Sequence, residues 1–322
     1  METETKNKIW VIKALGDNAD TFVPHTNDYE QAKEQIISKL QADKSAYEKD
    51  GFLFEEFIPN PIELTPQVIF YDGEPIYYSL DIENKPLGSG NIGTQLGCAQ
   101  NLICKTEEED EINQIAFPDV VYELAKKRHG MFIWDCSILL DEEGNKYFGE
   151  FCSNRPGWDA FPTELAMSHS LTYYFTKLMQ GGDPIVHKYG AGVRILNLGK
   201  NGSTQKDGSI QQSKEKNIFI YDGYNDKGLK TVGNNFDFAV VMGACDDIHE
   251  AVEEAYENIE NITLETKYYR PEFDFISEDY PTSIMNRYNT AIDEALIECE
   301  LPEDEEYGTM EENEEDEKEL LL

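Results

Sequence analysis

Two pairs of short apolar runs, each joined by a tight polar turn, most constrain what this chain can fold into. Residues 68–70 and 76–80 flank Tyr71-Asp72-Gly73-Glu74, and residues 131–140 and 146–151 flank an acidic turn that contains Gly144. An Asp-Gly dipeptide between β-rich runs favours a two-residue hairpin, because both turn positions need a positive φ. The chain is therefore expected to contain antiparallel strands.

Helical signals lie between these hairpins. The expected helices follow a capping box at Asn27 and Glu30, begin near Pro118, span residues 161–180, and follow a second capping box at Asp247 and Glu250. Hairpins mixed with helices, without strict alternation of strand and helix, predict an α+β fold built on antiparallel sheets.

The charge balance excludes two classes of partner. The chain of 322 residues has 27 Lys and Arg against 64 Asp and Glu, a formal net charge of −37. Such acidity opposes binding to nucleic acid or to an anionic membrane surface. Residues 301–322 hold eleven acidic residues and one lysine, which predicts a disordered, solvated tail. No apolar run is long enough to span a membrane, no secretory signal is recognisable, and the six cysteines form no CxxC pair, so we expect a cytoplasmic protein.

Carboxylates on the second hairpin predict a metal site. Asp135 lies on its first strand, Glu150 on its second, and Asn154 follows shortly afterwards. If these side chains share a face, their hard oxygen atoms suit Mg²⁺. The alternative interpretation is that Asp135 and Glu150 are solvent-facing residues of an acidic protein.

The order of several segments resembles the ATP-grasp superfamily. The metal-binding hairpin is joined by Val11-Ile12-Lys13-Ala14 and by Phe54-Glu55-Glu56-Phe57-Ile58 with a later Glu63. The resemblance implies two α+β subdomains that grip a nucleotide between antiparallel sheets. In the superfamily one residue separates the metal-binding Glu and Asn, whereas three residues separate Glu150 from Asn154 in this chain.

Within that superfamily, the chain is most similar to the phosphoribosylamine–glycine ligases. A segment with Asp81 leads into Gly88-Ser89-Gly90-Asn91-Ile92-Gly93-Thr94, and the later Tyr221-Asp222-Gly223 and Val240-Val241-Met242-Gly243-Ala244 are also similar. The implied organisation is an ATP-grasp domain over residues 1–185, a small C-terminal β/α domain over residues 186–275, a helical extension over residues 276–300 and the acidic tail over residues 301–322.

The resemblance implies an ATP-dependent ligase of purine biosynthesis that joins a small carboxylate to an amine through an acyl phosphate. Its cofactors would be ATP and Mg²⁺, and a separate chain would supply the N-terminal domain of the family. By the same resemblance, the catalytic residues are Arg155 and Asp81, and the metal ligands are Asp135, Glu150 and Asn154. The nucleotide-binding residues are Lys13, Glu55, Glu56, Phe57, Ile58 and Glu63, and the substrate-binding residues are Gly90, Asn91 and Gly93.

One departure keeps a second interpretation open. The glycine-rich phosphate loop of the family is replaced by a segment with Asp17 and Asp20, whose charges would repel a triphosphate. The chain is then either an active ligase or a non-catalytic ATP-grasp remnant that acts as a binding or assembly module. Residues 88–94 likewise either approach a substrate through backbone amides or form a flexible surface loop.

Overall fold

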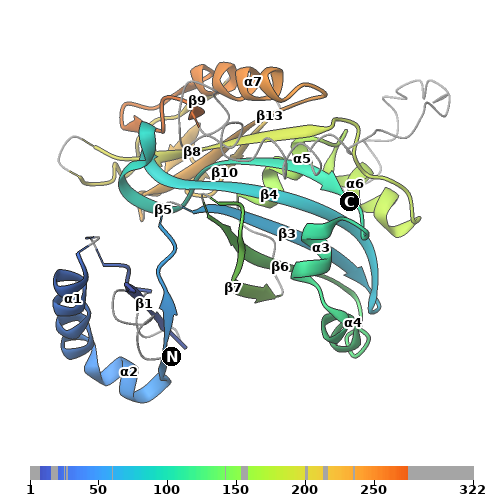
Figure 1. Ribbon diagram of the computed structural model, residues 1–322. Coiled ribbons are helices and arrows are strands. Elements are labelled where there is room, and N and C mark those ends of the chain that lie inside the picture. Colours follow the sequence, from blue (N-terminus) through green and yellow to red (C-terminus); the bar gives the residue numbers. More distant parts are fainter. Residues whose placement is uncertain are drawn as a thin grey trace, which may run out of the picture. The chain divides into compact units, whose positions relative to one another are not determined.

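A computed structural model describes most of the chain as two compact units (Figure 1). The described residues are 8–15, 21–24, 26, 28–59, 61–141, 143–153, 159–199, 202–212, 217–234 and 236–274. The predicted extension over residues 276–300, the predicted tail over residues 301–322, and both Asn154 and Arg155 lie outside them. Unit 1 comprises residues 1–62 and 139–147, and unit 2 comprises residues 63–138 and 148–322.

Unit 1 is a two-stranded antiparallel sheet with two helices. Strand β1 (Trp10–Ala14) pairs with β2 (Phe52–Glu56), and α1 (Tyr29–Ala42) and α2 (Lys44–Asp50) lie between them in sequence. Its small core is formed by Ile12, Ile36 and Tyr47. The predicted capping box at Asn27 is wrong by one residue. The N-cap is Asp28, whose carboxylate accepts a hydrogen bond from the Gln31 amide at 2.9 Å.

Unit 2 is built on a nine-stranded sheet, and most of its neighbouring strands pair antiparallel. The strand order is β10-β13-β8-β5-β4-β3-β6-β7, and β15 pairs with β8. The strands are β3 (Ile62–Tyr71), β4 (Glu74–Gly88), β5 (Ile92–Thr106), β6 (Met131–Leu140), β7 (Lys146–Ser153), β8 (Tyr189–Asn197), β10 (Ile218–Ile220), β13 (Asp237–Cys245) and β15 (Lys267–Tyr268). Two small sheets pair β11 (Gly223–Asn225) with β12 (Leu229–Thr231) and β9 (Gln211–Gln212) with β14 (Ile262–Thr263).

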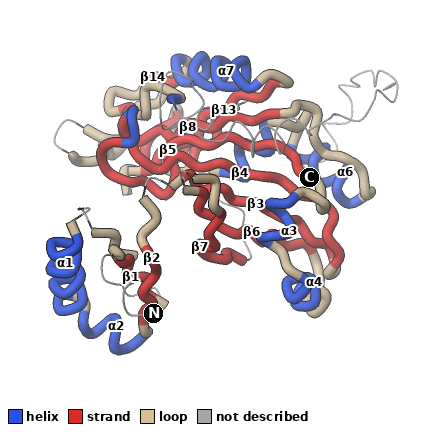
Figure 2. The backbone as a smooth tube through the Cα atoms, viewed as in Figure 1, coloured by secondary structure: helices blue, strands red, loops and turns tan. Residues whose placement is uncertain are grey.

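Helices cover both faces of this sheet (Figure 2). A Cβ on Gly243 of β13 would meet the backbone of α7 (Ile248–Glu260), whereas one on Gly192 of β8 would meet Thr163 of α5 (Ala160–Ala166). Met242 is the residue of β13 that lies opposite Gly192, so Gly243 faces the other side of the sheet. Helices α5 and α7 therefore pack on opposite faces. The remaining helices are α3 (Glu111–Ala116), α4 (Asp119–Ala125), α6 (Leu171–Met179) and the 3₁₀ turn η1 (Ser89–Asn91).

The structure confirms the α+β fold with an antiparallel sheet and both predicted hairpins. The turn at Asp72 and Gly73 has positive φ at both positions, 49° and 87°. The single helix expected over residues 161–180 is wrong. It is two helices, because the Ser170 hydroxyl accepts from the Tyr173 amide and begins α6 as a new N-cap. Among the described helices, none has the length and apolar character needed to cross a bilayer.

Candidate functional site

A row of polar side chains runs along one face of β4 in unit 2. Ser79, Asp81, Glu83 and Lys85 lie at every second position of β4, so all four project from the same face of the strand. Strand β3 adds Glu63 directly opposite Glu83. Asp81 is 1% exposed, and Glu83 and Glu63 are mostly buried. The large sheet thus carries a cluster of carboxylates that is largely shielded from water.

Lys85 is the cation of this cluster. Its ammonium group lies 2.7 Å from Glu63 Oε2 and 3.7 Å from Glu83 Oε2. Burial opposes the charged ammonium form, but the charges of Glu63 and Glu83 outweigh that effect and raise the pKa of Lys85. The Ser137 hydroxyl on β6 donates to Glu63 at 2.6 Å, and the Thr65 hydroxyl donates to Glu83 at 3.1 Å.

Two carboxyl groups on β4 have pKa values above their usual range. Burial, reinforced by the charges of Glu83 and Asp159, raises the pKa of Asp81 well above its usual range. Burial also raises the pKa of Glu83 to about 8, with Lys85 opposing the shift and Glu63 adding to it. Paired carboxylates with displaced pKa values are typical of functional sites, although structural networks produce them as well.

The second hairpin brings Asp135 close to Glu150 and Cys152. Asp135 on β6 is 7% exposed, and burial raises its pKa to about 6. A hydrogen bond from the Cys152 thiol opposes this shift, and the negative charge of Glu150 adds to it. The Phe151 ring contacts the Trp134 ring at 5.7 Å, so the residues on either side of Phe151 point toward Asp135. Asp135 and Glu150 therefore interact, while Asn154 lies outside the described residues.

Cys152 occupies the position two residues after Glu150, where the resembling family has its Asn. The sequence interpretation placed that role on Asn154 and did not consider Cys152. A thiol there is a softer ligand than an amide oxygen, so the donor set differs from an all-oxygen one.

Helix α5 contributes a second buried network to the same face. The Ser79 hydroxyl donates to Glu164 at 2.9 Å, and the Tyr174 hydroxyl also donates to this carboxylate. Burial, opposed by these two hydrogen bonds, raises the pKa of Glu164 to about 7. Thr163 Oγ1 lies 3.1 Å from Asn101 Oδ1 on β5, and the Asn101 amide reaches Asp81 at 3.4 Å.

In unit 1, the residues predicted to bind the nucleotide lie on β1, on β2 and just after β2. Lys13 lies 3.8 Å from Glu55, and Lys8 lies 2.5 Å from Glu56. The Phe57 amide donates to the Ile9 carbonyl at 2.9 Å, so this amide already has a partner, and Ile58 is partly buried beside it. The predicted ribose ligand Glu63 belongs to unit 2, in the cluster with Lys85.

Gly90, Asn91 and Gly93 form the tip that joins β4 to β5. All three have positive φ, between 59° and 90°. The Gly90 amide donates to Asp274 at 2.5 Å, and the Asn91 side-chain carbonyl accepts from Arg270 at 3.2 Å. Residues 88–94 are thus the end of a hairpin that is tied to the C-terminal part of unit 2. Residues 90–94 are exposed at the surface, and these two hydrogen bonds connect the tip to Asp274 and Arg270.

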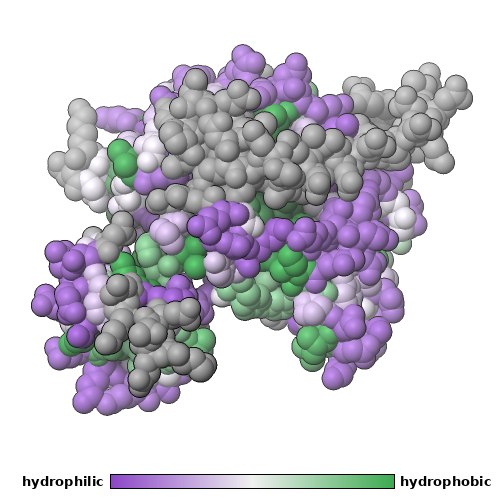
Figure 3. Space-filling model, viewed as in Figure 1, coloured by the Kyte–Doolittle hydropathy of each residue, from purple (hydrophilic) through white to green (hydrophobic). Residues whose placement is uncertain are grey.

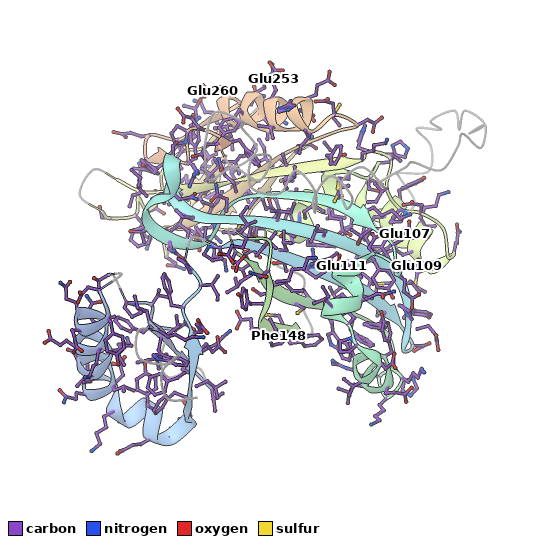
Figure 4. All side chains as sticks on the ribbon, in the orientation of Figure 1. Glu107, Glu109, Glu111, Phe148, Glu253 and Glu260 are labelled. Atoms are coloured by element: carbon purple, nitrogen blue, oxygen red, sulfur yellow. The ribbon has the colours of Figure 1, made fainter. Side chains whose placement is uncertain are left out.

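Sequence reasoning missed Glu83, Lys85, Cys98 and Asp159. The polar residues at every second position from 79 to 85, with Leu80 and Ile82 between the first three, could have identified Glu83 and Lys85. Figure 3 shows apolar residues on the sheet face around β6 and β7. Figure 4 shows Phe148 at the outer part of β7. Phe148 is 65% exposed. In the same view the labelled Glu253 and Glu260 of α7 point outward, away from the sheet.

No protein-family model matches the chain, and no curated protein matches it in sequence. Solved structures match its fold. The phosphoribosylamine–glycine ligase of Thermotoga maritima is 20% identical with a TM-score of 0.61, over 81% of this chain and 68% of that one. The biotin carboxylase domain of the Hydrogenobacter thermophilus 2-oxoglutarate carboxylase, in complex with MgADP, ADP and bicarbonate, is 14% identical with a TM-score of 0.57, over 91% and 66% of the two chains.

A biotin carboxylase of Campylobacter jejuni in complex with an ATP analogue is 14% identical with a TM-score of 0.53, over 85% of this chain and 63% of that one. This chain thus spans about two thirds of the length of each of these structures. The three similarities show that the chain has the fold of ATP-grasp enzymes, whose members here are ligases and carboxylases.

Proposed function

We propose that this chain is an ATP-dependent ligase that joins a small carboxylate to an amine through an acyl phosphate. Among known activities, the proposed reaction would be most similar to that of the phosphoribosylamine–glycine ligases of purine biosynthesis. The observation that carries the proposal is the interaction of Asp135 with Glu150 on adjacent strands, in a chain that has the ATP-grasp fold. A buried carboxylate beside a second acid is a suitable place for a divalent cation.

The donor set fits magnesium at Asp135 and Glu150, because both offer hard carboxylate oxygens. When bound, Mg²⁺ would neutralise phosphate charge during phosphoryl transfer. The proposed nucleotide residues are Lys13 for the phosphates, Glu55, Glu56, Phe57 and Ile58 for the base, and Glu63 for the ribose. We further propose that Asn154 completes the metal ligands, that Arg155 and Asp81 take part in the reaction, and that Gly90, Asn91 and Gly93 contact the substrate.

The charge on Lys85 also supports the proposal. Its ammonium group keeps a raised pKa between two glutamates, so it stays cationic in a buried setting. A fixed cation beside a developing anion lowers the barrier to acyl phosphate formation more than the same charge would in water. Lys85 was not among the residues selected from the sequence, and we assign it the role of holding negative charge at the reacting groups.

A second candidate function is a non-catalytic module with the ATP-grasp fold. Two observations favour it: Cys152 stands where the family has an amide ligand, and Asp17 and Asp20 stand in the segment of the phosphate loop. Both changes would weaken the binding of a magnesium–triphosphate complex. A partner protein supplying the N-terminal domain of the family would be compatible with either candidate.

Nucleotide titration separates the two candidates. We expect calorimetry with the full chain to show ATP binding in the presence of Mg²⁺ and at least about tenfold weaker binding with a chelator, equivalent to about 1.4 kcal/mol. Asp135→Asn should abolish most of this metal dependence. Asp226→Asn is the matched control, because Asp226 is an exposed acid that pairs with Lys230 at 2.9 Å far from the β6–β7 hairpin in sequence.

A measurement of phosphate release then tests catalysis. ATP hydrolysis coupled to ligation should require one carboxylate and one amine together, with glycine and phosphoribosylamine as the first pair. Metal-independent nucleotide binding, or binding unaffected by Asp135→Asn, would contradict the ligase proposal. Metal-dependent binding without turnover for any pair would favour the non-catalytic module.

A further inference from the structure

A second group of potential ligands includes neither Asp135 nor Glu150. The group consists of Glu83, Cys98 and Asp159. Each residue offers one ligand atom, and these three atoms lie within 4.8 Å of one another. Cys98 is 2% exposed and Asp159 is 6% exposed, while the Glu83 side chain is 16% exposed. The three residues come from β4, from β5 and from the N-cap position of α5, so they are distant in sequence and meet only in the folded unit 2.

An irregularity in β5 places the thiol in this group. From the Asn84–Gln100 pair to the Pro86–Gln95 pair, β5 contributes more residues than β4, which marks a bulge. A bulge interrupts the regular alternation of side chains and can turn one of them to the opposite face. Cys98 lies within this bulge. Its thiol donates to the Gln100 carbonyl at 2.9 Å and lies beside Glu83 and Asp159, on a face that strict alternation from Asn101 would not give it.

Unpartnered oxygen atoms provide an independent sign of a missing ligand. Asp159 Oδ2 and Asp81 Oδ1 are both fully buried, and neither has a hydrogen-bond partner among the residues that the structure describes. Asp81 is 1% exposed, lies two residues before Glu83 on the same face of β4, and interacts electrostatically with both Glu83 and Asp159. A buried carboxylate oxygen without a partner is costly, and a cation between these groups would satisfy both atoms.

Charged side chains of both signs surround this group. Four carboxylates, Glu63, Asp81, Glu83 and Asp159, face two cations within the described part of unit 2. These are Lys85, which pairs with Glu63 and Glu83, and Arg194, which lies 3.5 Å from Asp237. Binding of a divalent cation to this group would release the proton of the Cys98 thiol to solvent.

We propose that Glu83, Cys98 and Asp159, with Asp81 beside them, form a binding site for a thiophilic divalent cation of the Zn²⁺ type. A thiolate ligand selects Zn²⁺ over Mg²⁺, and Zn²⁺ accepts four ligands of mixed sulfur and oxygen type. Zinc–sulfur and zinc–oxygen bonds of about 2.3 and 2.1 Å require ligand atoms a few ångströms apart. The spacing within 4.8 Å meets that requirement. The site uses none of the proposed magnesium ligands Asp135, Glu150 and Asn154, but it adjoins Asp81, to which the proposed function gives a part in the reaction.

Cobalt binding to the full, reduced chain tests the proposal. Co²⁺ substitutes for Zn²⁺ and gives a thiolate-to-metal charge-transfer absorption that oxygen ligands do not produce. We expect one equivalent of Co²⁺ to produce this absorption, an equivalent of Zn²⁺ to remove it, and an excess of Mg²⁺ to leave it unchanged. Cys98→Ala should eliminate the absorption. Cys104→Ala, a fully buried thiol on the same strand, is the matched control and should retain it.

Two further variants keep the test decisive. Cys152→Ala should also retain the absorption; its loss there would assign the metal to the Asp135 side and overturn the proposal. If Cys98→Ala fails to fold by circular dichroism, Asp159→Asn replaces it and should weaken Co²⁺ binding at least about tenfold. No thiolate absorption in the unmodified chain, or an unchanged absorption in Cys98→Ala or Asp159→Asn, would refute the site.

Discussion

Replacing Arg270 by Met should destabilise unit 2 severely. Arg270 is 1% exposed and holds the hairpin tip and the C-terminal part of unit 2 together. Its guanidinium donates to the Pro86 carbonyl at 2.6 Å, to the Asn91 side chain at 3.2 Å, and to Asp274 through Nε at 3.0 Å and Nη2 at 2.5 Å. Methionine fills a similar volume but donates nothing.

The expected cost follows from the carboxylate that remains behind. Asp274 is 3% exposed. Without Arg270, the backbone amide of Gly90, at 2.5 Å, is the only hydrogen-bond donor left to the Asp274 carboxylate among the described contacts. Breaking a buried ion pair by removing one partner costs about 3–5 kcal/mol, because the other charge stays buried without compensation. A loss of that size is a large fraction of the free energy of unfolding of a typical protein, which is about 5–15 kcal/mol.

Urea unfolding followed by circular dichroism measures this cost. The double variant Arg270→Met/Asp274→Asn separates the lost charge pair from the lost contacts, because Asn still accepts from Gly90. We expect the double variant to be about 1–3 kcal/mol more stable than the sum of the two single effects predicts. Arg128→Met is the control: the guanidinium contacts the Phe132 ring face at 4.8 Å, and its removal should cost only about 1 kcal/mol.

Hydrogen exchange localises the effect. In Arg270→Met, the amides of residues 90–93 should exchange faster, while those of β13 should change less. A cost for Arg270→Met below about 1 kcal/mol, or strict additivity in the double variant, would show that the Arg270–Asp274 pair does not hold the hairpin tip.

Two other predictions concern the face covered by α5. Gly192→Ala should lower the free energy of unfolding by about 1–3 kcal/mol, because its Cβ would lie 2.1 Å from Asn101 Oδ1 and 2.3 Å from Thr163 Oγ1. Gly182→Ala is the control and should be nearly neutral, because the nearest atom to its Cβ would be 3.6 Å away. Equal effects of the two substitutions in urea unfolding would contradict the close approach of α5. Glu164 has its pKa raised from 4.5 to about 7 in the folded state, so folding takes up a proton between these values and stability falls as pH rises through them. Glu164→Gln lacks this slope, so its stability relative to the unmodified chain should improve by about 3 kcal/mol from pH 4.5 to pH 7.5, and a difference independent of pH would refute the assignment.

Local sequence signals predicted the elements whose formation depends on neighbouring residues. The hairpin at Asp72 and Gly73 formed as expected, because positive φ at those two positions is a local property. The N-cap of α7 at Asp247 is also confirmed, since its carboxylate accepts from the amides of His249 and Glu250. The helix expected over residues 161–180 failed for an equally local reason, because Ser170 caps a new helix and this signal was not used.

The candidate site could be predicted only in part. Asp135 and Glu150 lie on one hairpin, so period-two alternation was enough to expect their interaction. Lys85 was within reach of the same argument on β4. Cys98 was not, because its direction depends on a bulge in the pairing of β4 with β5, which the sequence of either strand does not reveal.

The sequence by itself determined the hairpins β3–β4 and β6–β7, the beginnings of α4, α5 and α7 and the surplus of acidic charge, because each depends on residues close together in the chain. Tertiary structure decided which charges are buried together and which segments are held in place. Asp159 meets Glu83 and Cys98, Asp274 accepts from the Gly90 amide, and Arg270 donates to Asn91, through contacts between residues 61 to 184 positions apart in the chain. Such contacts follow from the packing of whole sheets and helices, and burial then sets the electrostatic consequence of each one.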